Sequence, residues 1–515
     1  MSAVRHRGVW LLLAALLLVA LRLPGFRIPM DQDTGCYAYV GWTWATGGLP
    51  YRDAWDHKPP AIYLIPATLT AAVGEPTANA LRACSVGLGV GTLLLVFAIS
   101  RRLFDEAVGL AAAAVYAVAS SGVLMTRETL ETEQPMVFFC LLAVWLMVVA
   151  DRRWRWWVLA LAGLSAGASM MFKPVSAPVL GLAFLWLVGR QWAGEAAARR
   201  TVQAAALVGG GVVAVPAAFA GYFAAVGILG DVRGAMAYNF VYQATAEHAG
   251  VVANARLFLS NVTYSRLREF GPEQAWLVLL AGVGFLVALV RWRGPGLVLQ
   301  VLWVVGAGLG VVGAGRFYAY YFVPLCAALA PLGGVAAVWV VRGLRSARPW
   351  PAKAGLAGVA ALVVAALAAG VWRDVKLYRQ LVSPQHTNVM LARLAKTIRS
   401  DTERADCIFV WGTRQQVYVQ ARRRAPTRYT YDAPFRDREA ARRFFGEGIF
   451  EELAQAVRAG RCPYVLVTDL RALEGFDALA DLLASDYREV AREQRGPMVT
   501  CLYRRREATE AGEAT

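Results

Sequence analysis

The segment MDQDTGCYAYVGWTWATGGLPYRDAWDHKPPAIYLIP, residues 30–66, interrupts an otherwise apolar chain. Directly after the first apolar block, it places many ionisable side chains beside a dense set of aromatic residues. These ionisable residues are Asp31, Asp33, Asp53, Asp56, His57 and Lys58. Such a segment is either a solvated loop of ordinary polar content or the place where chemistry occurs. The apolar blocks around it show where it lies.

The composition is that of a polytopic membrane protein. Hydrophobic residues make up 57% of the 515 residues, and the mean hydropathy is +0.44. The apolar residues form blocks of about 20 residues, the length at which a helix crosses a bilayer. The sequence predicts eleven transmembrane helices, at residues 8–24, 79–100, 106–124, 134–150, 157–172, 175–189, 202–226, 274–290, 296–313, 317–341 and 355–372.

Basic residues set the expected orientation of these helices. The net charge of +17 does not point to nucleic acid, because much of the Lys and Arg lies in short loops on one side of the predicted bundle. The positive-inside rule places such loops, for example Arg101–Arg102 and Arg152–Arg155, in the cytoplasm together with the N-terminus. Residues 30–66, the long loop at 227–273 and everything after residue 373 then lie on the external face.

The apolar stretch at 59–74 is too short to be a further span. It has 16 residues and begins with Pro59 and Pro60, which suit the first turn of a helix. Counting it as a span would also invert every later loop and place the basic clusters outside. We therefore predict a juxtamembrane helix within a first external loop at 25–78, in a membrane module that covers residues 1–374.

The pattern changes near residue 375. Short apolar runs at 407–412, 427–431, 463–469 and 498–505 predict strands, and helical periodicity at 438–460 and 476–487 predicts helices between them. This alternation predicts a small extracytoplasmic α/β domain over residues 375–505. Residues 506–515 read as a disordered tail. The pattern does not decide whether Cys407, Cys462 or Cys501 forms a disulfide.

Two groups of acids are candidates for catalysis. Asp33 can either cap a helix that begins near Gly35 or serve as a general base near the membrane surface. The second group lies just before the fourth span and also has two interpretations. These acids either solvate a loop and stabilise the N-terminus of the next helix, or they orient an acceptor or bind a cation. This second group consists of Glu128, Glu131 and Glu133.

Three cations share one unusual placement. Lys58, Lys173 and Arg316 each lie at an external helix end, which the positive-inside preference does not explain. A lone lysine there commonly extends toward lipid headgroups. Three cations on one face beside acids are what a phosphate-bearing lipid requires.

These motifs resemble the GT-C membrane glycosyltransferases, in particular bacterial members of glycosyltransferase family 39, the protein-mannosyltransferase and aminoarabinose-transferase type. The resemblance covers nearly the whole chain. Its most specific part is DQDTGCYAYVGWTWATGGLPYRDAWDHKPP (31–60), which has an Asp, a Tyr four residues later, Gly-x-Pro-Tyr and Lys-Pro-Pro. It continues with Glu133, Lys173, an arginine followed by aromatics (Arg316 to Pro324), and RRRAPTRYTY at 422–431.

The resemblance implies a GT-C bundle and an inverting transfer of a sugar from a polyprenyl-phosphate carrier to a hydroxyl acceptor. The enzyme would act at the external face of the bacterial cytoplasmic (inner) membrane, among membrane lipids. Asp33 and Glu133 match the catalytic acids, and Lys58, Lys173 and Arg316 match the cations near the donor phosphate. Supporting positions are Asp31, Tyr37, Asp56, His57, Glu128, Glu131 and Tyr320.

The chain departs from the family pattern at two positions. Thr34 follows Asp33 where many relatives have Glu, and Tyr320 stands where some have His. The motif therefore supports no metal ligand; a divalent cation is an alternative rather than an expected cofactor. A polytopic transporter or lipid flippase without transferase activity is the alternative function, although such proteins tend to place polar residues near the membrane midplane.

Overall fold

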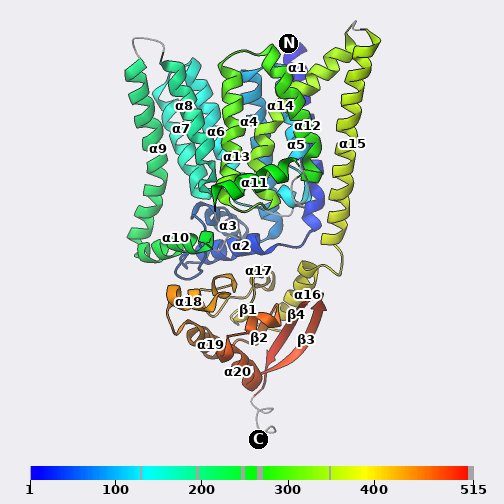
Figure 1. Cartoon of the computed structure of the whole chain (residues 1–515). Helices are drawn as coiled ribbons and strands as arrows, with labels where there is room; N and C mark the ends of the chain where they lie inside the picture. Colours follow the sequence, from blue (N-terminus) through cyan, green and yellow to red (C-terminus); the bar gives the residue numbers. More distant parts are fainter. Residues whose placement is uncertain are drawn as a thin grey trace.

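The computed structural model describes residues 2–127, 130–192, 197–244, 250–263, 271–346 and 349–507. In these residues a helix occupies each of the eleven predicted spans (Figure 1). The helices are α1 (Ser2–Arg22), α4 (Ala78–Leu103), α5 (Glu106–Ala119), α6 (Glu133–Arg152), α7 (Trp156–Phe172), α8 (Ala177–Gln191), α9 (Ala197–Ala225), α12 (Gly271–Arg291), α13 (Pro295–Ala314), α14 (Val323–Arg345) and α15 (Trp350–Leu381). Together they form one helical layer.

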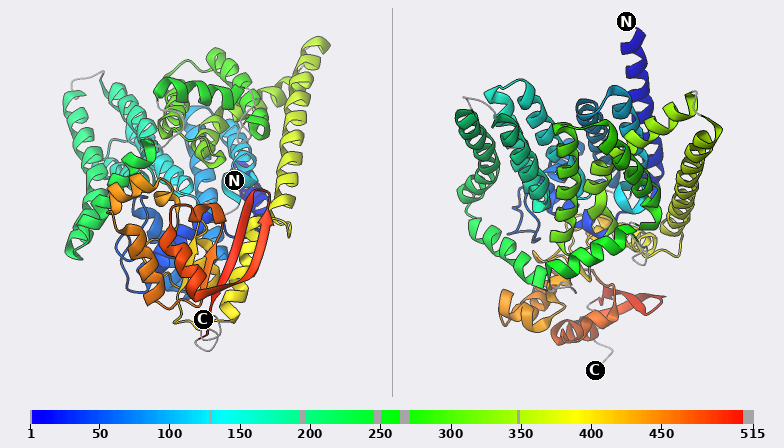
Figure 2. Two further views of the ribbon diagram at one scale, coloured as in Figure 1. Left: turned by 60° about the horizontal axis from the view of Figure 1, so that its bottom comes forward. Right: turned by 45° about the horizontal axis from the view of Figure 1, so that its top comes forward.

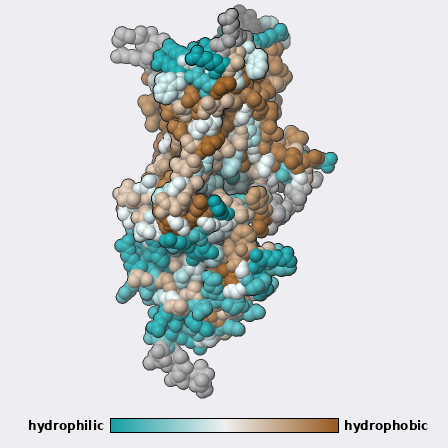
Figure 3. Space-filling model, turned by 90° about the vertical axis from the view of Figure 1, so that its left-hand side faces the viewer, coloured by the Kyte–Doolittle hydropathy of each residue, from teal (hydrophilic) through white to brown (hydrophobic). Residues whose placement is uncertain are grey.

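The helical layer has the surface of a membrane protein. By length and composition, 8 of the described helices can cross a membrane, whereas α5, α7 and α8 are shorter, with 14, 17 and 15 residues. Large apolar side chains such as Leu286 and Leu362 are exposed on it, 64% and 68% respectively. Figure 3 shows a hydrophobic band over this layer between two hydrophilic ends. The protein is therefore a multi-pass membrane protein.

Short helices cover the end of the bundle that faces away from the N-terminus. α2 (Gln32–Ala45), α3 (Ala61–Val73) and α10 (Leu229–Ala244) lie across this end in Figure 1, and α11 (Val251–Thr263) follows α10. With 13 residues, α3 is too short to span a bilayer, and it packs on α2, so the predicted juxtamembrane helix is confirmed. The sequence treated 227–273 as a loop without naming α10 and α11.

The C-terminal part is a small sheet with helices, placed beneath α2 and α3 (Figures 1 and 2). Its strands have the order β1-β2-β4-β3, with β1 and β2 parallel and the other neighbours antiparallel. They are β1 (Ile408–Trp411), β2 (Tyr464–Val467), β3 (Tyr487–Arg495) and β4 (Met498–Arg505). The helices are α16 (Thr387–Ser400), α17 (Gln416–Ala421), α18 (Arg438–Phe445), α19 (Ile449–Ala459) and α20 (Asp477–Asp486).

Three details differ from the sequence predictions. The stretch 427–431 is not a strand, because it contacts the segment between α2 and α3: the Trp55 amide donates to the Arg428 carbonyl at 2.8 Å. The predicted helix 438–460 is divided into α18 and α19 around Gly446. β3 was missed because most of its side chains are exposed, so it carries no apolar alternation.

A disulfide joins Cys407 and Cys462, while Cys501 is a buried free thiol. Cys407 immediately precedes β1, and Cys462 lies two residues before β2. The disulfide therefore joins the starts of the two parallel strands. It closes a loop with a sequence separation of 55 residues. A disulfide here agrees with the predicted external location, because such bonds persist in oxidising compartments.

Replacing both bonded cysteines should destabilise the C-terminal part. For a loop of this length, the Cys407→Ser/Cys462→Ser variant is expected to lose about 4 kcal/mol, because the unfolded chain is no longer constrained. The measurement is the rate at which a maleimide labels buried Cys501 in the purified full-length protein, read by peptide mass spectrometry. Faster labelling is expected. Labelling at the wild-type rate throughout a urea series would contradict a stabilising role for the bridge.

Candidate active site

Asp31 and Asp33, at the start of α2, have different roles. Asp31 is the N-cap: its side chain accepts from the Thr34 amide at 2.8 Å and from the Thr34 hydroxyl at 3.1 Å. The sequence had considered Asp33 for this cap. Asp33 instead lies in the first turn, where its Oδ2 accepts a hydrogen bond from Tyr320 at 3.2 Å. Because the cap is supplied by Asp31, the Asp33 carboxylate is available to a ligand.

A cavity of ≈ 990 Å³ separates the end of the bundle from the C-terminal part. Most predicted site residues line it. They are Asp31, Asp33, Tyr37, Asp56, His57, Lys58, Glu131, Lys173, Arg316 and Tyr320. Glu133 lies behind this surface, and Glu128 is outside the described residues. The fold thus brings together residues from the first loop, the ends of α7 and α13, and the segment before α6.

Lys58 stands at the centre of the charged groups. Its Nζ donates to His57 Nε2 at 3.1 Å. Burial opposes its positive charge, but the carboxylates of Asp56 and Asp33 outweigh burial and raise the pKa of Lys58. Lys58 is therefore a permanent cation that faces the cavity.

His57 is a neutral link between Lys58 and Asp56. Burial, assisted by the charge of Lys58, lowers the pKa of His57 below its ordinary value. Because an ammonium only donates, Nε2 is the acceptor and the ring proton lies on Nδ1. That nitrogen is 3.2 Å from Asp56 Oδ1 and 3.3 Å from the Tyr431 hydroxyl.

Asp56 and Asp33 respond differently to their surroundings. Asp56 accepts from Tyr63 at 2.8 Å, Tyr431 at 2.9 Å and the His57 amide at 2.8 Å. Burial would raise the pKa of Asp56, but Lys58 and these donors lower it far below the usual range. At Asp33 burial dominates and raises the pKa, with Asp31 and Asp56 adding to it and Lys58 opposing. Asp33 is thus the stronger base of the two.

The other two cations have different partners. Lys173 forms an ion pair with buried Glu133 and lies 3.4 Å from the centroid of the Tyr321 ring. Burial lowers the pKa of Lys173 although Glu133 favours its charge. Glu133 also accepts from the Thr132 hydroxyl at 2.9 Å. The structure therefore places Glu133 as the counter-ion that holds Lys173.

Arg316 follows the end of α13, where Gly315 adopts a left-handed conformation with φ 64°. Its guanidinium carbon lies 4.0 Å from the centroid of the Tyr242 ring, and Nη2 donates to the Tyr242 carbonyl at 3.1 Å. Its Nε is buried and finds no hydrogen-bond acceptor among the described residues. Arg316 thus keeps a donor for an anion in the cavity.

Glu131 completes the acidic side of the cavity. Burial raises its pKa well above the usual value, and the charges of Asp31 and Asp33 add to this effect. Glu131 is therefore protonated more readily than a solvated glutamate, and in its protonated form it donates a hydrogen bond as well as accepting one.

Several residues of the site come from segments that the sequence did not single out. Tyr431 reaches Asp56 from the C-terminal part, and Asn239 of α10 donates to the His57 carbonyl at 2.8 Å. For Tyr431 a signal existed, because RRRAPTRYTY was part of the family resemblance. Asn239 and Tyr242 carried no such signal.

The C-terminal part is held against α2 by close backbone contact. A Cβ at Gly35 would lie 2.4 Å from the Gln416 amide nitrogen, so only glycine lets α17 approach α2 this closely. Near the other end of α2, the guanidinium carbon of Arg424 lies 3.5 Å from the centroid of the Trp42 ring, and Arg424 donates to Thr43 at 2.8 Å. These contacts fix the C-terminal part over the cavity.

The chain has the fold of the GT-C membrane glycosyltransferases. Residues 57–219 match the sequence profile of the family described as dolichyl-phosphate-mannose-protein mannosyltransferase, which confirms the resemblance seen in the sequence. No curated protein matches the sequence.

Two solved structures show the extent of the shared fold. ArnT from Cupriavidus metallidurans bound to undecaprenyl phosphate is 16% identical with a TM-score of 0.56, and the alignment covers 96% of this chain and 98% of that chain. The archaeal oligosaccharyltransferase AglB from Archaeoglobus fulgidus, in complex with an inhibitory peptide and a dolichol-phosphate, is 15% identical with a TM-score of 0.53. The alignment with AglB covers 96% of this chain and 74% of the AglB chain. At these identities the likeness concerns the fold.

The contact at Gly35 can be tested by adding a single methyl group. Gly35→Ala should lower stability by about 1–3 kcal/mol, the usual cost of overpacking, because the new Cβ collides with the backbone of α17. Gly87→Ala in α4 is the matched control, since a Cβ there meets nothing within 4 Å. Thermal unfolding of the purified proteins gives the comparison. Equal melting temperatures for Gly35→Ala and wild type would contradict the close contact.

Proposed function

We propose that the protein is an inverting glycosyltransferase that moves a sugar from a polyprenyl-phosphate carrier to a hydroxyl acceptor. The reaction takes place at the external face of the cytoplasmic membrane of a bacterium. One observation carries the proposal. A carboxylate with a raised pKa, that of Asp33, and the cations Lys58 and Arg316 line the same cavity at the end of the membrane bundle. The GT-C fold and the relative bound to undecaprenyl phosphate support it.

The donor phosphate binds between Lys58 and Arg316. Both face the cavity, and the unpartnered Nε of Arg316 supplies a further donor. The membrane bundle lies on one side of these cations, so the polyprenyl chain stays in the apolar layer while its phosphate reaches them. Charge that develops on the departing phosphate is stabilised there. Lys173, held by Glu133, adds a third cation to the same wall.

Asp33 acts as the general base. The acceptor oxygen forms a bond to the anomeric carbon as the bond from that carbon to the phosphate oxygen breaks, and the phosphate leaves with the electron pair. The acceptor proton passes to Asp33, whose raised pKa suits this role. A single displacement of this kind inverts the anomeric configuration.

The remaining predicted residues support this centre. Asp31 caps α2, and Asp56 and His57 hold Lys58. Tyr320 orients Asp33, while Tyr37 and Glu131 complete the wall of the cavity. We propose the division into a membrane module at 1–374 and an extracytoplasmic domain at 375–505 on the same basis; the predicted tail at 506–515 lies, from residue 508 onward, outside the described residues. A transporter would place such charges near the midplane, whereas here they gather at one end of the bundle.

Removing the base tests the assignment of Asp33. Asp33→Asn should lower turnover by about 10²–10⁴-fold, the usual contribution of a general base. The assay follows release of polyprenyl phosphate from a polyprenyl-phosphate sugar by protein in liposomes. Asp31→Asn is the control; because asparagine caps a helix about as well as aspartate does, this variant should be as stable as the wild type and keep most of its turnover. Wild-type turnover in Asp33→Asn would exclude the proposed role.

The pH dependence tests the coupling of Asp33 to Lys58. Because the reactive form is the carboxylate, kcat/KM should fall as pH decreases through the pKa of Asp33. Burial raises this pKa above the usual value of about 3.9. Lys58 lowers it, so Lys58→Gln should shift the acidic limb to still higher pH and also weaken donor binding.

Lys376→Gln provides the charge-matched control, since Lys376 lies in α15 beside the Trp372 ring. Its acidic limb should match that of the wild type. An acidic limb that stays in place in Lys58→Gln, or moves to lower pH, would contradict the coupling.

A further inference from the structure

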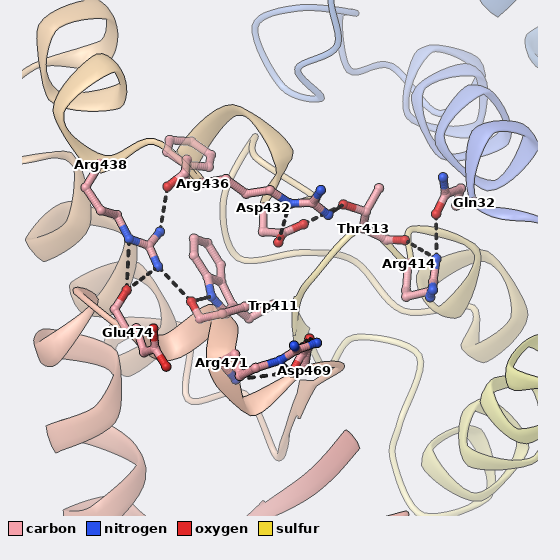
Figure 4. A network of polar contacts seen from close by, with 12 residues as sticks. Gln32, Trp411, Thr413, Arg414, Asp432, Arg436, Arg438, Asp469, Arg471 and Glu474 are labelled. Atoms are coloured by element: carbon pink, nitrogen blue, oxygen red, sulfur yellow. Dashed lines mark hydrogen bonds and ion pairs between the residues drawn. The ribbon is translucent and has the colours of Figure 1, made fainter. Parts of the chain in front are cut away.

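The C-terminal part supplies one complete wall of the cavity, which we term the outer wall. It comprises Gly412–Gln415 after β1, Thr468 and Asp469 after β2, and the side chains of Arg436, Arg438 and Arg471 (Figure 4). β1 and β2 are parallel, so both loops leave the carboxyl edge of the sheet. Open α/β sheets bind ligands at that edge. The sheet therefore turns its ligand-binding edge toward Asp33.

Gly412 shapes this edge. Its φ of 136° lies in a region that favours glycine, and a Cβ there would be 1.8 Å from Thr468 Oγ1. The loop after β1 can thus turn against the loop after β2, where the Thr468 amide donates to the Trp411 carbonyl at 2.9 Å. This turn brings Thr413 and Arg414 to the cavity.

The arginines of the outer wall differ in how their charge is balanced. Arg436 is 3.2 Å from Asp432 Oδ2, and Arg471 is 2.7 Å from Asp469 Oδ2. Arg438 donates only to main-chain carbonyls, including that of Ala472 at 2.7 Å. Arg414 donates to the Gln32 side chain and, at 3.0 Å, to the Thr413 carbonyl. Within the described chain, neither Arg414 nor Arg438 forms an ion pair, and the carboxylate of Asp432, which pairs with Arg436, acts on both only from a longer distance.

Arg414 also retains hydrogen-bonding capacity. Its Nε is buried and has no acceptor among the residues that the structure describes. Its bond to Gln32 ties it to the first turn of α2, where Gln32 immediately precedes Asp33 (Figure 4). An anion on Arg414 would therefore lie in the same cavity as Asp33, at the same end of α2.

We propose that the outer wall is the acceptor subsite and that the acceptor carries an anionic group, a phosphate or a carboxylate, which Arg414 binds. This inference rests on the proposed function. The donor phosphate must stay near Lys58 and Arg316, because its polyprenyl chain lies in the membrane layer. The outer wall belongs to the part of the protein outside that layer, so its free cationic charge serves the second substrate. Binding there directs the acceptor hydroxyl toward Asp33.

A binding experiment on the full-length protein separates the two substrates. The purified protein is first saturated with undecaprenyl phosphate. This ligand occupies the proposed donor site at Lys58 and Arg316 and cannot react, because it carries no sugar. Glycerol 1-phosphate, glycerate and glycerol are then titrated by calorimetry. At least one of the two anions should bind and glycerol should not; which anion binds distinguishes a phosphate-bearing from a carboxylate-bearing acceptor.

Variants then locate the second site. Arg414→Gln should weaken anion binding by about tenfold or more, the cost of losing a charged hydrogen bond. Arg436→Gln, at a side chain that is 66% exposed, should weaken it less. Arg443→Gln is the matched control, because Arg443 lies on exposed α18, pairs with Glu439 and does not line the cavity. It should bind as the wild type does.

Each result bears on one of the two proposals. If neither anion binds to the loaded protein, or if Arg414→Gln binds as tightly as Arg443→Gln, the acceptor subsite is wrong while the donor assignment stands. If undecaprenyl phosphate itself does not bind, the proposed function fails, and the inference fails with it.

Discussion

The site depends on keeping one partly buried ammonium group charged at the wall of the cavity. Burying a charge is costly unless it is paired and hydrogen-bonded. Lys58 meets this requirement through Asp56, Asp33 and the ring of His57. Each of these partners needs its own support, and that support comes from distant segments. Contacts to the segment between α2 and α3 therefore come from Tyr63 of α3, Asn239 of α10 and Tyr431 of the C-terminal part.

The membrane explains why these groups gather at one end of the bundle. A helix in a bilayer satisfies its own backbone, and ionisable side chains within the apolar layer are expensive. Polar chemistry is therefore placed where the helices end and irregular backbone is possible. The C-terminal part closes this region, and the contact of Gly35 with Gln416 fixes its distance from α2. Enclosure by protein on both sides produces the burial that raises the pKa of Asp33.

The sequence predicted the bundle well, because the bilayer imposes a length and an apolar composition that can be read locally. It also identified Asp33, Asp56 and Lys58 as candidate site residues, since these lie in one short segment. It could not show that Asp31 rather than Asp33 caps α2, because both fit the residue preference for a cap. Nor could it place Tyr431 or Arg414 in the cavity, because their approach to Asp56 and Gln32 depends on how two distant parts of the chain pack.

Which carboxylate is the better candidate for the proposed base follows from hydrogen bonding and burial together rather than from charge alone. Asp33 and Asp56 both interact with Lys58, so the cation does not distinguish them. Three donors surround Asp56 and stabilise its ionised form so strongly that it accepts a proton poorly. At Asp33 the hydrogen bond from Tyr320 and the attraction of Lys58 do not offset burial, and two neighbouring aspartates oppose its charge. The three hydrogen bonds thus make Asp56 an inert counter-ion, whereas Asp33, which lacks them, is better able to take a proton.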